Sequence, residues 1–125
     1  TAYEIVDCDW SSDVCSSDLI ERILELSGFT EEVREADLIL TGEGSFDWQS
    51  LSGKAIAGIG RAASVWGVPV VVLAGRVDLG RREWQSIGIH GVYSMSDMAD
   101  EQTALVDPEH TLSDCAERVA RTWGR

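Results

Sequence analysis

The sequence predicts an α/β fold built on a parallel sheet. Short apolar runs of strand length stand at 37–41 and 68–74, and a weaker one stands at 91–95. Segments with apolar residues at helical spacing lie between and after these runs. Strands that alternate with helices in this way favour a parallel sheet covered on both faces. Ligand sites in such sheets lie at the carboxyl ends of the strands, so we expect functional residues near Gly42 and Gly75.

The first nineteen residues do not fit this pattern. Residues 1–5 and 9–19 are what two constant blocks of a sequencing-library adapter would encode when translated. The residues between them leave room for a variable index. A natural acidic, serine-rich leader is the alternative. Segments that derive from cloning or processing are excluded from fold reasoning. We therefore expect Thr1 to Leu19 to be a non-native segment and residues 20–125 to carry the fold.

Excluding that segment changes the charge and the cysteine content. It holds five of the 22 acidic residues, so 17 acidic residues remain against 10 basic ones and the net charge falls from −12 to about −7. Such acidity argues against nucleic-acid or anionic-membrane partners, which need a basic face. Cys115 is left without a cysteine partner and is expected to be a small buried residue. No apolar run approaches the ~18 residues of a membrane span, and a cytoplasmic location is the default expectation.

The first predicted elements are two helices and a strand. Apolar residues from Ile20 onward have near-helical spacing, and Gly28 is placed to end this helix in a left-handed cap. Thr30 is a candidate N-cap for a second helix over 30–36, with two glutamates in its first turn. The run 37–41 then predicts a buried strand that ends at Gly42. Because the retained sequence begins inside a helical pattern without a cap, we expect it to be truncated.

Further elements continue the alternation. A polar, glycine-rich loop is predicted over 42–54, followed by a helix of small residues over 55–66. The β-branched run 68–74 is a strand that closes at Gly75. Later segments predict, in order, a helix over 81–87, a strand over 91–95, a helical turn over 100–106 and a final helix over 111–123. The last helix is expected to turn Leu112, Cys115, Ala116 and Val119 inward.

The loop after the first strand is where chemistry is expected. Gly42 and Gly44 let the backbone approach a ligand closely, and Lys54 offers a point charge for phosphate near a helix start. Glu43 and Asp47 are carboxylates suited to Mg²⁺ held largely through water, or to accepting a proton from a hydroxyl. These are the groups that phosphoryl transfer needs. The structural alternative is a solvent-exposed turn with glycines for geometry and charges for solubility.

Familiar nucleotide motifs do not decide between a loop for phosphoryl transfer and a solvent-exposed turn. The third glycine of the dinucleotide fingerprint is missing after Gly44, and Ala55 stands where a Walker loop needs Ser or Thr. Arg76, which follows the second predicted strand, faces the expected cleft and is a candidate phosphate contact; an exposed loop arginine is the alternative.

The block Ala36 to Lys54, ADLILTGEGSFDWQSLSGK, resembles the motif block of bacterial two-domain, ATP-dependent glycerate kinases that runs from ADL through TGEG to a final GK. The similarity continues through 67–75 and 87–94 and covers nearly all of residues 20–125. The resemblance implies that this stretch is the C-terminal portion of a flavodoxin-like, three-layer domain. It implies an enzyme that converts glycerate to phosphoglycerate with ATP and Mg²⁺. Ser45 stands where many members have arginine, which removes one expected anion contact.

The resemblance also implies site residues. Glu43 and Asp47 are expected to serve the metal or the proton, and Lys54 the phosphate or the substrate carboxylate. Gln49 and Ser50 are expected hydrogen-bonding partners. Four glycines are expected to shape the backbone around the ligand: Gly42, Gly44, Gly53 and Gly75.

Two alternatives to an active kinase remain. A noncatalytic nucleotide- or metabolite-binding α/β module would keep the glycine turns without needing Glu43, Asp47 and Lys54 together. The chain itself is also expected to be inactive, because kinases of this family close a cleft between two domains. The full-length parent is expected to bind a small molecule, with homo-oligomerisation left open.

Overall fold

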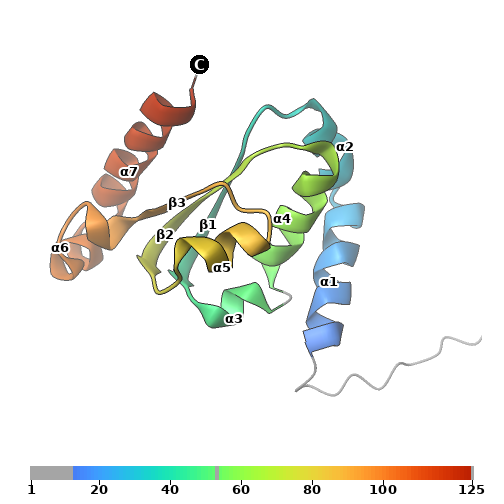
Figure 1. Cartoon of the computed structure of the whole chain (residues 1–125). Helices are drawn as coiled ribbons and strands as arrows, with labels where there is room; N and C mark the ends of the chain where they lie inside the picture. The colour runs from blue at the N-terminus through green and yellow to red at the C-terminus, as the bar shows by residue number, and fades with distance from the viewer. Residues whose placement is uncertain (1–12, 53, 125) are drawn as a thin grey trace, which may run out of the picture.

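The computed structural model describes residues 13–52 and 54–124, and within them it shows a three-stranded parallel sheet flanked by helices (Figure 1). The strands are β1 (Ile39–Phe46), β2 (Val70–Val77) and β3 (Gly91–Ser94), in the order β1-β2-β3. Both pairs are parallel. The predicted α/β class is therefore confirmed.

Helices precede, connect and follow the strands. Their bounds are α1 (Asp13–Leu26), α2 (Phe29–Glu35), α3 (Trp48–Leu51), α4 (Ala55–Trp66), α5 (Arg81–Ser86), α6 (Glu101–Val106) and α7 (Pro108–Trp123), with a 3₁₀ turn η1 (Met95–Asp97). No helix among the described residues is long and apolar enough to cross a membrane.

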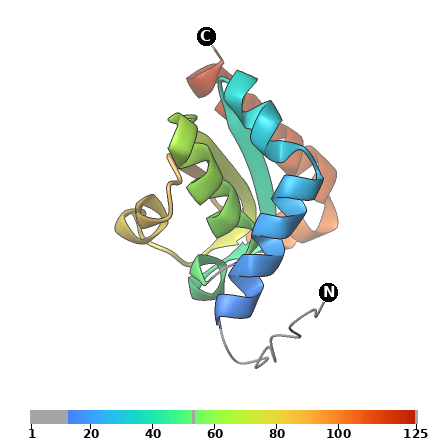
Figure 2. The same cartoon turned by 90° about the vertical axis from the view of Figure 1, so that its right-hand side faces the viewer.

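One face of the sheet carries most of the core. On this face α4 packs against β1 and β2, and α1 and α2 lie outside α4 (Figure 2). The core here includes Val70, Val72 and Ala74 of β2, together with Ile56 of α4 and Phe46 at the end of β1. All five side chains are buried. A continuous β-branched run such as β2 is stable only when both faces are covered, and this layer covers one of them.

The opposite face is covered by α7, with α6 beside it. Cys115 and Val119 of α7 are buried, as the sequence predicted, and Trp123 donates an indole hydrogen bond to the Tyr93 hydroxyl of β3 (3.1 Å). Burial raises the pKa of the Cys115 thiol, in keeping with a structural residue. Leu112 is 44% exposed, so the expectation that it points into the core was wrong.

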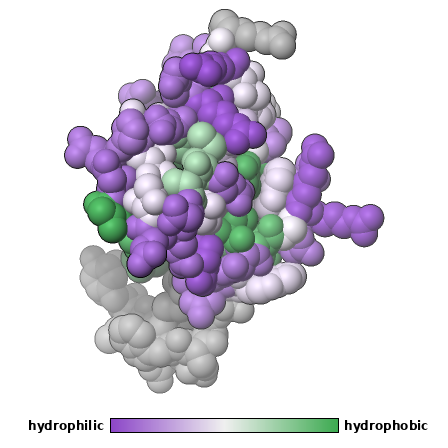
Figure 3. Space-filling model, turned by 90° about the vertical axis from the view of Figure 1, so that its left-hand side faces the viewer, coloured by the Kyte–Doolittle hydropathy of each residue, from purple (hydrophilic) through white to green (hydrophobic). Residues whose placement is uncertain are grey.

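Coverage of this second face stops short of β1. The helix α7 contacts β2 and β3, whereas Leu40 of β1 remains 54% exposed. Figure 3 shows the side that carries α6 and α7, where green apolar groups lie in patches among purple polar ones. The sequence-based expectation of a sheet covered on both faces therefore holds for β2 and not for β1.

Several boundaries differ from the sequence-based prediction. Both β1 and β2 continue past the glycines that were expected to end them, because Ser45 pairs with Arg76 and Phe46 with Val77. The second helix is preceded by Gly28 in a left-handed conformation (φ 74°) without a side-chain cap, so Thr30 lies inside the helix. Of the segment predicted to be non-native, residues 13–19 form the first part of α1, and residues 1–12 lie outside the described part.

Candidate functional site at the ends of strands β1 and β2

A cavity of about 550 Å³ opens on the uncovered face of β1. Its floor is lined by Gly42, Glu43 and Gly44 in β1 and Gly75 in β2. The opposite wall is formed by α6 and the start of α7, through Leu105 and Leu112. The cavity therefore joins the glycine-rich strand segment to helices that lie more than fifty residues later in the sequence.

Glycine is required at one position of this floor. A Cβ atom added to Gly75 would lie 2.6 Å from the Gly44 carbonyl oxygen, too close for any side chain. At Gly44 an added Cβ would meet nothing within 4 Å. Gly75 is thus fixed by close approach of the two strands, while Gly44 leaves open space that keeps the floor free of side chains.

Glu43 differs from its neighbours because one carboxylate oxygen lacks a partner. Glu43 lines the cavity through its place in β1, but it pairs with the core residue Ala74, so its side chain lies on the α4 face of the sheet. There its Oε2 is buried without a hydrogen bond from the residues that the structure describes. A buried carboxylate oxygen left unpaired carries a desolvation cost, typically about 1–3 kcal/mol. Such an atom is suited to accept a hydrogen bond from a ligand or to bind a cation.

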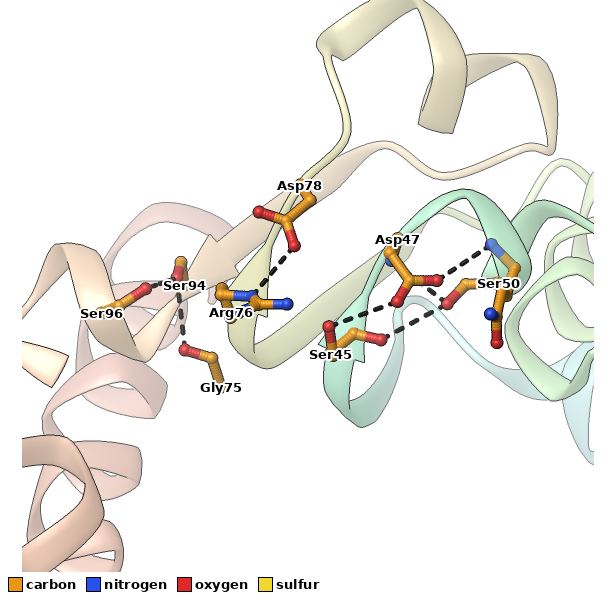
Figure 4. A network of polar contacts seen from close by, with 9 residues as sticks. Ser45, Asp47, Ser50, Gly75, Arg76, Asp78, Ser94 and Ser96 are labelled. Carbon is orange, nitrogen blue, oxygen red and sulfur yellow. Dashed lines mark hydrogen bonds and ion pairs between the residues drawn. The ribbon is translucent and has the colours of Figure 1, made fainter.

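Asp47 lies in the turn between β1 and α3, and hydrogen bonds hold its carboxylate. Its Oδ1 accepts from the Gln49 amide (2.9 Å), and Ser45 Oγ donates to its Oδ2 (3.4 Å). The Asp47 amide in turn donates to Ser50 Oγ (3.3 Å). Asp47 is therefore the N-cap of α3, and Figure 4 shows Ser45, Asp47 and Ser50 directed toward one another. The alternative that this loop is a turn whose residues serve structure therefore has direct support at Asp47.

Lys54 is linked to the same turn. Its Nζ donates to Gln49 Oε1 (3.2 Å), so the ammonium, the amide side chain and the Asp47 cap form one chain of contacts. The lysine is exposed and precedes α4 as its N-cap residue. Gly53, the remaining glycine predicted for this loop, lies outside the described residues.

Arg76 stands in β2 opposite Ser45 of β1. Its Nε is 2.9 Å from Asp78 Oδ2, and both side chains are about half exposed. An ion pair at this exposure contributes only about 0–1 kcal/mol and can open at little cost. Figure 4 places the Arg76 side chain between the Asp47 turn and a cluster formed by Ser94 and Ser96, called the Ser94 cluster below.

The Ser94 cluster was not predicted as a site from the sequence. Ser94 Oγ donates to the Gly75 carbonyl (3.5 Å) and lies 2.7 Å from Ser96 Oγ, which ties the end of β3 to the cavity floor. Ser45 and Asp78 were also missed. The only available signal was position, since each follows or ends a predicted strand and carries a short polar side chain.

The predicted site residues thus fall into neighbouring sets. Gly42, Glu43, Gly44 and Gly75 line the cavity, whereas Asp47, Gln49, Ser50 and Lys54 form the β1–α3 turn. Within the described residues, no group of three or more His, Cys, Asp or Glu side chains could hold a metal by itself. Any Mg²⁺ here would need ligands from water or substrate in addition to protein, as is usual for this ion.

A model of the glycerate kinase family matches residues 14–124, which includes the whole of this site. The chain belongs to the glycerate kinase family. The match to the family covers every strand and the helices that line the cavity, so the resemblance found in the ADLILTGEG segment extends to the complete described fold.

Individual relatives agree with the family assignment. An uncharacterized protein of Mycobacterium bovis is 40% identical over 103 residues, which cover 82% of this chain and 27% of the relative. A glycerate kinase of Bacillus subtilis is 32% identical over 102 residues, with 82% and 26% covered. A glycerate kinase of Halalkalibacterium halodurans is 37% identical over 76 residues, with 61% and 20% covered. The chain spans about a quarter of the length of the first two relatives.

Proposed function

We propose that this chain is part of a glycerate kinase that transfers a phosphoryl group from ATP to a hydroxyl of glycerate. The observation that carries the proposal is the β1–α3 segment, in which a partnerless carboxylate, a helix-capping aspartate and a lysine follow one another beside a cavity. Family membership supports the choice of reaction. In the reaction, the hydroxyl oxygen bonds to the γ-phosphorus, the bond to the departing ADP breaks, and the hydroxyl proton is released.

Glu43 is the proposed residue for Mg²⁺. Its Oε2 is buried and without a partner, which fits a carboxylate that meets a cation only when substrate is present. Mg²⁺ is commonly held by one or two carboxylates plus phosphate and water. When bound, the ion neutralises charge on the transferring phosphate.

Asp47 and Lys54 are proposed for the proton and the phosphate. Asp47 would accept the hydroxyl proton while its cap interactions hold the carboxylate in place, and it is a further candidate for the metal. Lys54, exposed and bound only to the neutral Gln49 amide among the described residues, can turn to an anion without breaking an ion pair. Proton transfer by a positioned side chain typically contributes about 10²–10⁴-fold in rate.

The other predicted residues have supporting parts in the proposal. Arg76 would exchange its exposed pairing with Asp78 for substrate phosphate. Gln49 and Ser50 would position the turn, and the glycines at 42, 44, 53 and 75 would keep the backbone accessible.

The chain as it stands is proposed to be a portion of the parent domain, with residues 1–19 of adapter origin and residues 20–125 from the flavodoxin-like domain. We expect catalysis to need the rest of the parent, and a cytoplasmic setting follows from a small anionic substrate and nucleotide.

The test uses a full-length relative, such as the glycerate kinase of Bacillus subtilis. The residues that align with Glu43 and Asp47 are replaced by Gln and Asn, and glycerate-dependent ADP formation is measured. We expect kcat to fall at least about 100-fold in each variant, with little change in the melting temperature. The matched control replaces the residue aligned with Trp48, a 63% exposed side chain here, by Ala. Turnover within about twofold of the parent in both acidic variants would contradict the proposal.

A noncatalytic metabolite-binding module is the second candidate. Its support is that Asp47 already has a structural task as the cap of α3, so its presence does not require chemistry. The ADP assay on the full-length relative distinguishes the kinase site from the binding module. If this segment only binds a metabolite, turnover should be unchanged in the acidic variants.

A further inference from the structure

Ser94, the last residue of β3, is buried although its side chain is polar. It is 5% exposed, and the other buried polar side chains among the described residues are Ser50 and Thr111. The hydroxyls of those two contact their own turns, whereas Ser94 reaches Gly75, 19 residues earlier in the chain. Buried polar side chains in folded proteins almost always have a specific hydrogen-bond partner. Ser94 therefore joins two strand ends at the edge of the site.

The contacts of the Ser94 hydroxyl form a chain, which Figure 4 shows next to the Arg76 side chain. Ser94 Oγ is 2.7 Å from Ser96 Oγ and 3.5 Å from the Gly75 carbonyl oxygen. A hydroxyl has one hydrogen to donate, and a carbonyl can only accept. Both contacts are hydrogen bonds only when Ser96 donates to Ser94 and Ser94 donates to Gly75. The short Ser96 contact thus directs the Ser94 hydrogen toward β2.

The Gly75 carbonyl lies where the pairing of β1 with β2 is interrupted. The register includes the pairs on both sides, but it omits Gly44 with Gly75. Glycine is conformationally free, so its backbone needs outside contacts to be held. The carbonyl belongs to the planar peptide unit that joins Gly75 to Arg76. A hydrogen bond from Ser94 to this carbonyl therefore helps to fix the direction in which Arg76 leaves the strand.

Arg76 is the residue that gains from a fixed backbone. Its side chain is 57% exposed and pairs with Asp78, and under the proposed function it leaves that carboxylate for the substrate phosphate. A side chain that moves between two anions keeps its aim only if its own backbone is held. Binding groups need such support from neighbouring residues to stay near the productive geometry.

We propose that Ser94 is a positioning residue for Arg76. Through the Gly75–Arg76 peptide it aims the guanidinium at the anionic group of the substrate, and Ser96 assists by donating to the Ser94 oxygen. Ser94 itself does not touch the substrate. This rests on the proposed function, which gives Arg76 a phosphate to bind.

The experiment titrates the ¹⁵N-labelled 125-residue chain with inorganic triphosphate and follows the Arg76 Nε–H resonance by NMR. We expect a saturable shift. Ser94→Ala removes the hydroxyl and should weaken triphosphate binding at least about threefold, toward the lower end of couplings within one hydrogen-bond network. Ser94→Thr keeps the hydroxyl and should remain within about twofold of the original chain. Ser94→Cys, which keeps the size but donates only weakly, is a second removal variant in case the alanine variant does not fold.

Two controls separate positioning from stability. Thr111→Val removes another buried hydroxyl, which donates to the Asp107 carbonyl (2.9 Å). It should change triphosphate affinity by no more than about twofold, whatever it does to the melting temperature. In an Arg76→Gln background, Ser94→Ala should have no further effect on the residual binding, followed there through the amides of residues 42–54, because the residue that it positions is gone.

Four results would overturn the assignment. They are no saturable triphosphate shift at Arg76, unchanged affinity in the variants that remove the Ser94 hydroxyl, equal weakening by Thr111→Val, or the same effect of Ser94→Ala with and without Arg76. If any of them occurs while the acidic variants of the full-length relative still lose turnover, the Ser94 assignment fails and the proposed kinase function stands. If the Ser94 results are as expected and turnover is unchanged in those acidic variants, the kinase proposal fails and Ser94 supports a noncatalytic anion site.

Discussion

At the scale of single residues, Asp47 combines a structural contact with a proposed chemical one. Its carboxylate accepts hydrogen bonds from the Gln49 amide and the Ser45 hydroxyl, which hold it at the start of α3. A carboxylate fixed in this way is pre-oriented for a substrate, yet its removal also disturbs the turn. Loss of activity in an alanine variant would therefore mix two effects.

The two effects can be separated by comparing substitutions in this chain. Asp47→Ala removes the cap and should lower the free energy of unfolding by about 1 kcal/mol, whereas Asp47→Asn keeps a capping oxygen and should cost clearly less. Urea denaturation followed by circular dichroism measures both. An equal loss in the two variants would mean that the cap contributes through charge, and the Asn variant could then no longer report on chemistry alone.

The sequence predicted which residue types form the site better than how they are arranged. Glu43 and Gly75 were expected at a ligand site and line the cavity. The pairing of Arg76 with Asp78 was not predicted, because it depends on β2 continuing past Gly75. The leucine wall was also missed, since Leu105 and Leu112 come from helices whose position relative to β1 is set only by the tertiary fold.

At the scale of elements, glycine was given too much weight as a terminator. Glycine usually weakens a strand, which is why Gly42 and Gly75 were expected to end theirs. The structure extends both strands because their backbones pair with one another, as far as Phe46 opposite Val77. The buried Phe46 side chain anchors this extension, and the Asp78 amide adds a hydrogen bond to the Phe46 carbonyl (2.9 Å). Tertiary pairing thus outweighed a local preference.

Helix ends were predicted more reliably where the cap is a glycine. Gly67 adopts the left-handed conformation (φ 69°) that ends α4, directly after the predicted helix 55–66. Gly28 also adopts it, and the next helix begins directly afterwards at Phe29, so no room is left for Thr30 to act as a cap. Residue types alone do not tell whether a single glycine joins the two helices or whether a glycine ends the first helix and a threonine caps the second.

The short helix α6 is expected to be sensitive to acid. Asp100 caps it by accepting from the Thr103 hydroxyl (2.7 Å) and amide (3.0 Å), and these bonds lower the pKa of Asp100. A lowered folded-state pKa means that the stabilisation is present above the unfolded value and is lost as the pH falls through the folded one. The protection of α6 amides against exchange, relative to the intrinsic exchange rate at each pH, should therefore fall below about pH 3.9.

The control for this prediction is Asp100→Asn. Asparagine retains a capping oxygen and does not titrate, so the step in α6 exchange should disappear while global acid unfolding of the chain remains. A step of equal size in the Asn variant would show that other carboxylates cause it. Since α6 forms a wall of the cavity, the same acidification should loosen that wall.

At the scale of the whole molecule, the sheet is asymmetric. β2 is paired on both sides and buried on both faces, whereas β1 is paired only with β2 within the described chain and shows Leu40 to solvent. An open strand edge with an uncovered apolar face is a surface that proteins normally protect. This asymmetry agrees with a chain that spans about a quarter of its relatives' length.

The isolated chain is accordingly expected to lack catalysis. Purified Thr1–Arg125 should show no glycerate-dependent ATP turnover above a buffer control, because transition-state stabilisation needs groups on all sides of the transferring phosphate. A coupled assay for ADP checks this. Measurable turnover that Lys54→Ala abolishes would show that the chain is an enzyme by itself.

The central claim is that the ends of β1 and β2 form the phosphate-handling part of a nucleotide site. Titrating the ¹⁵N-labelled chain with Mg²⁺ and ATP, and mapping the amide shifts by residue, tests this claim most directly. The largest shifts are predicted in residues 42–54 and at Gly75 and Arg76. Shifts concentrated on the outer helices α1 and α2, or no saturable shift at millimolar ATP, would contradict it.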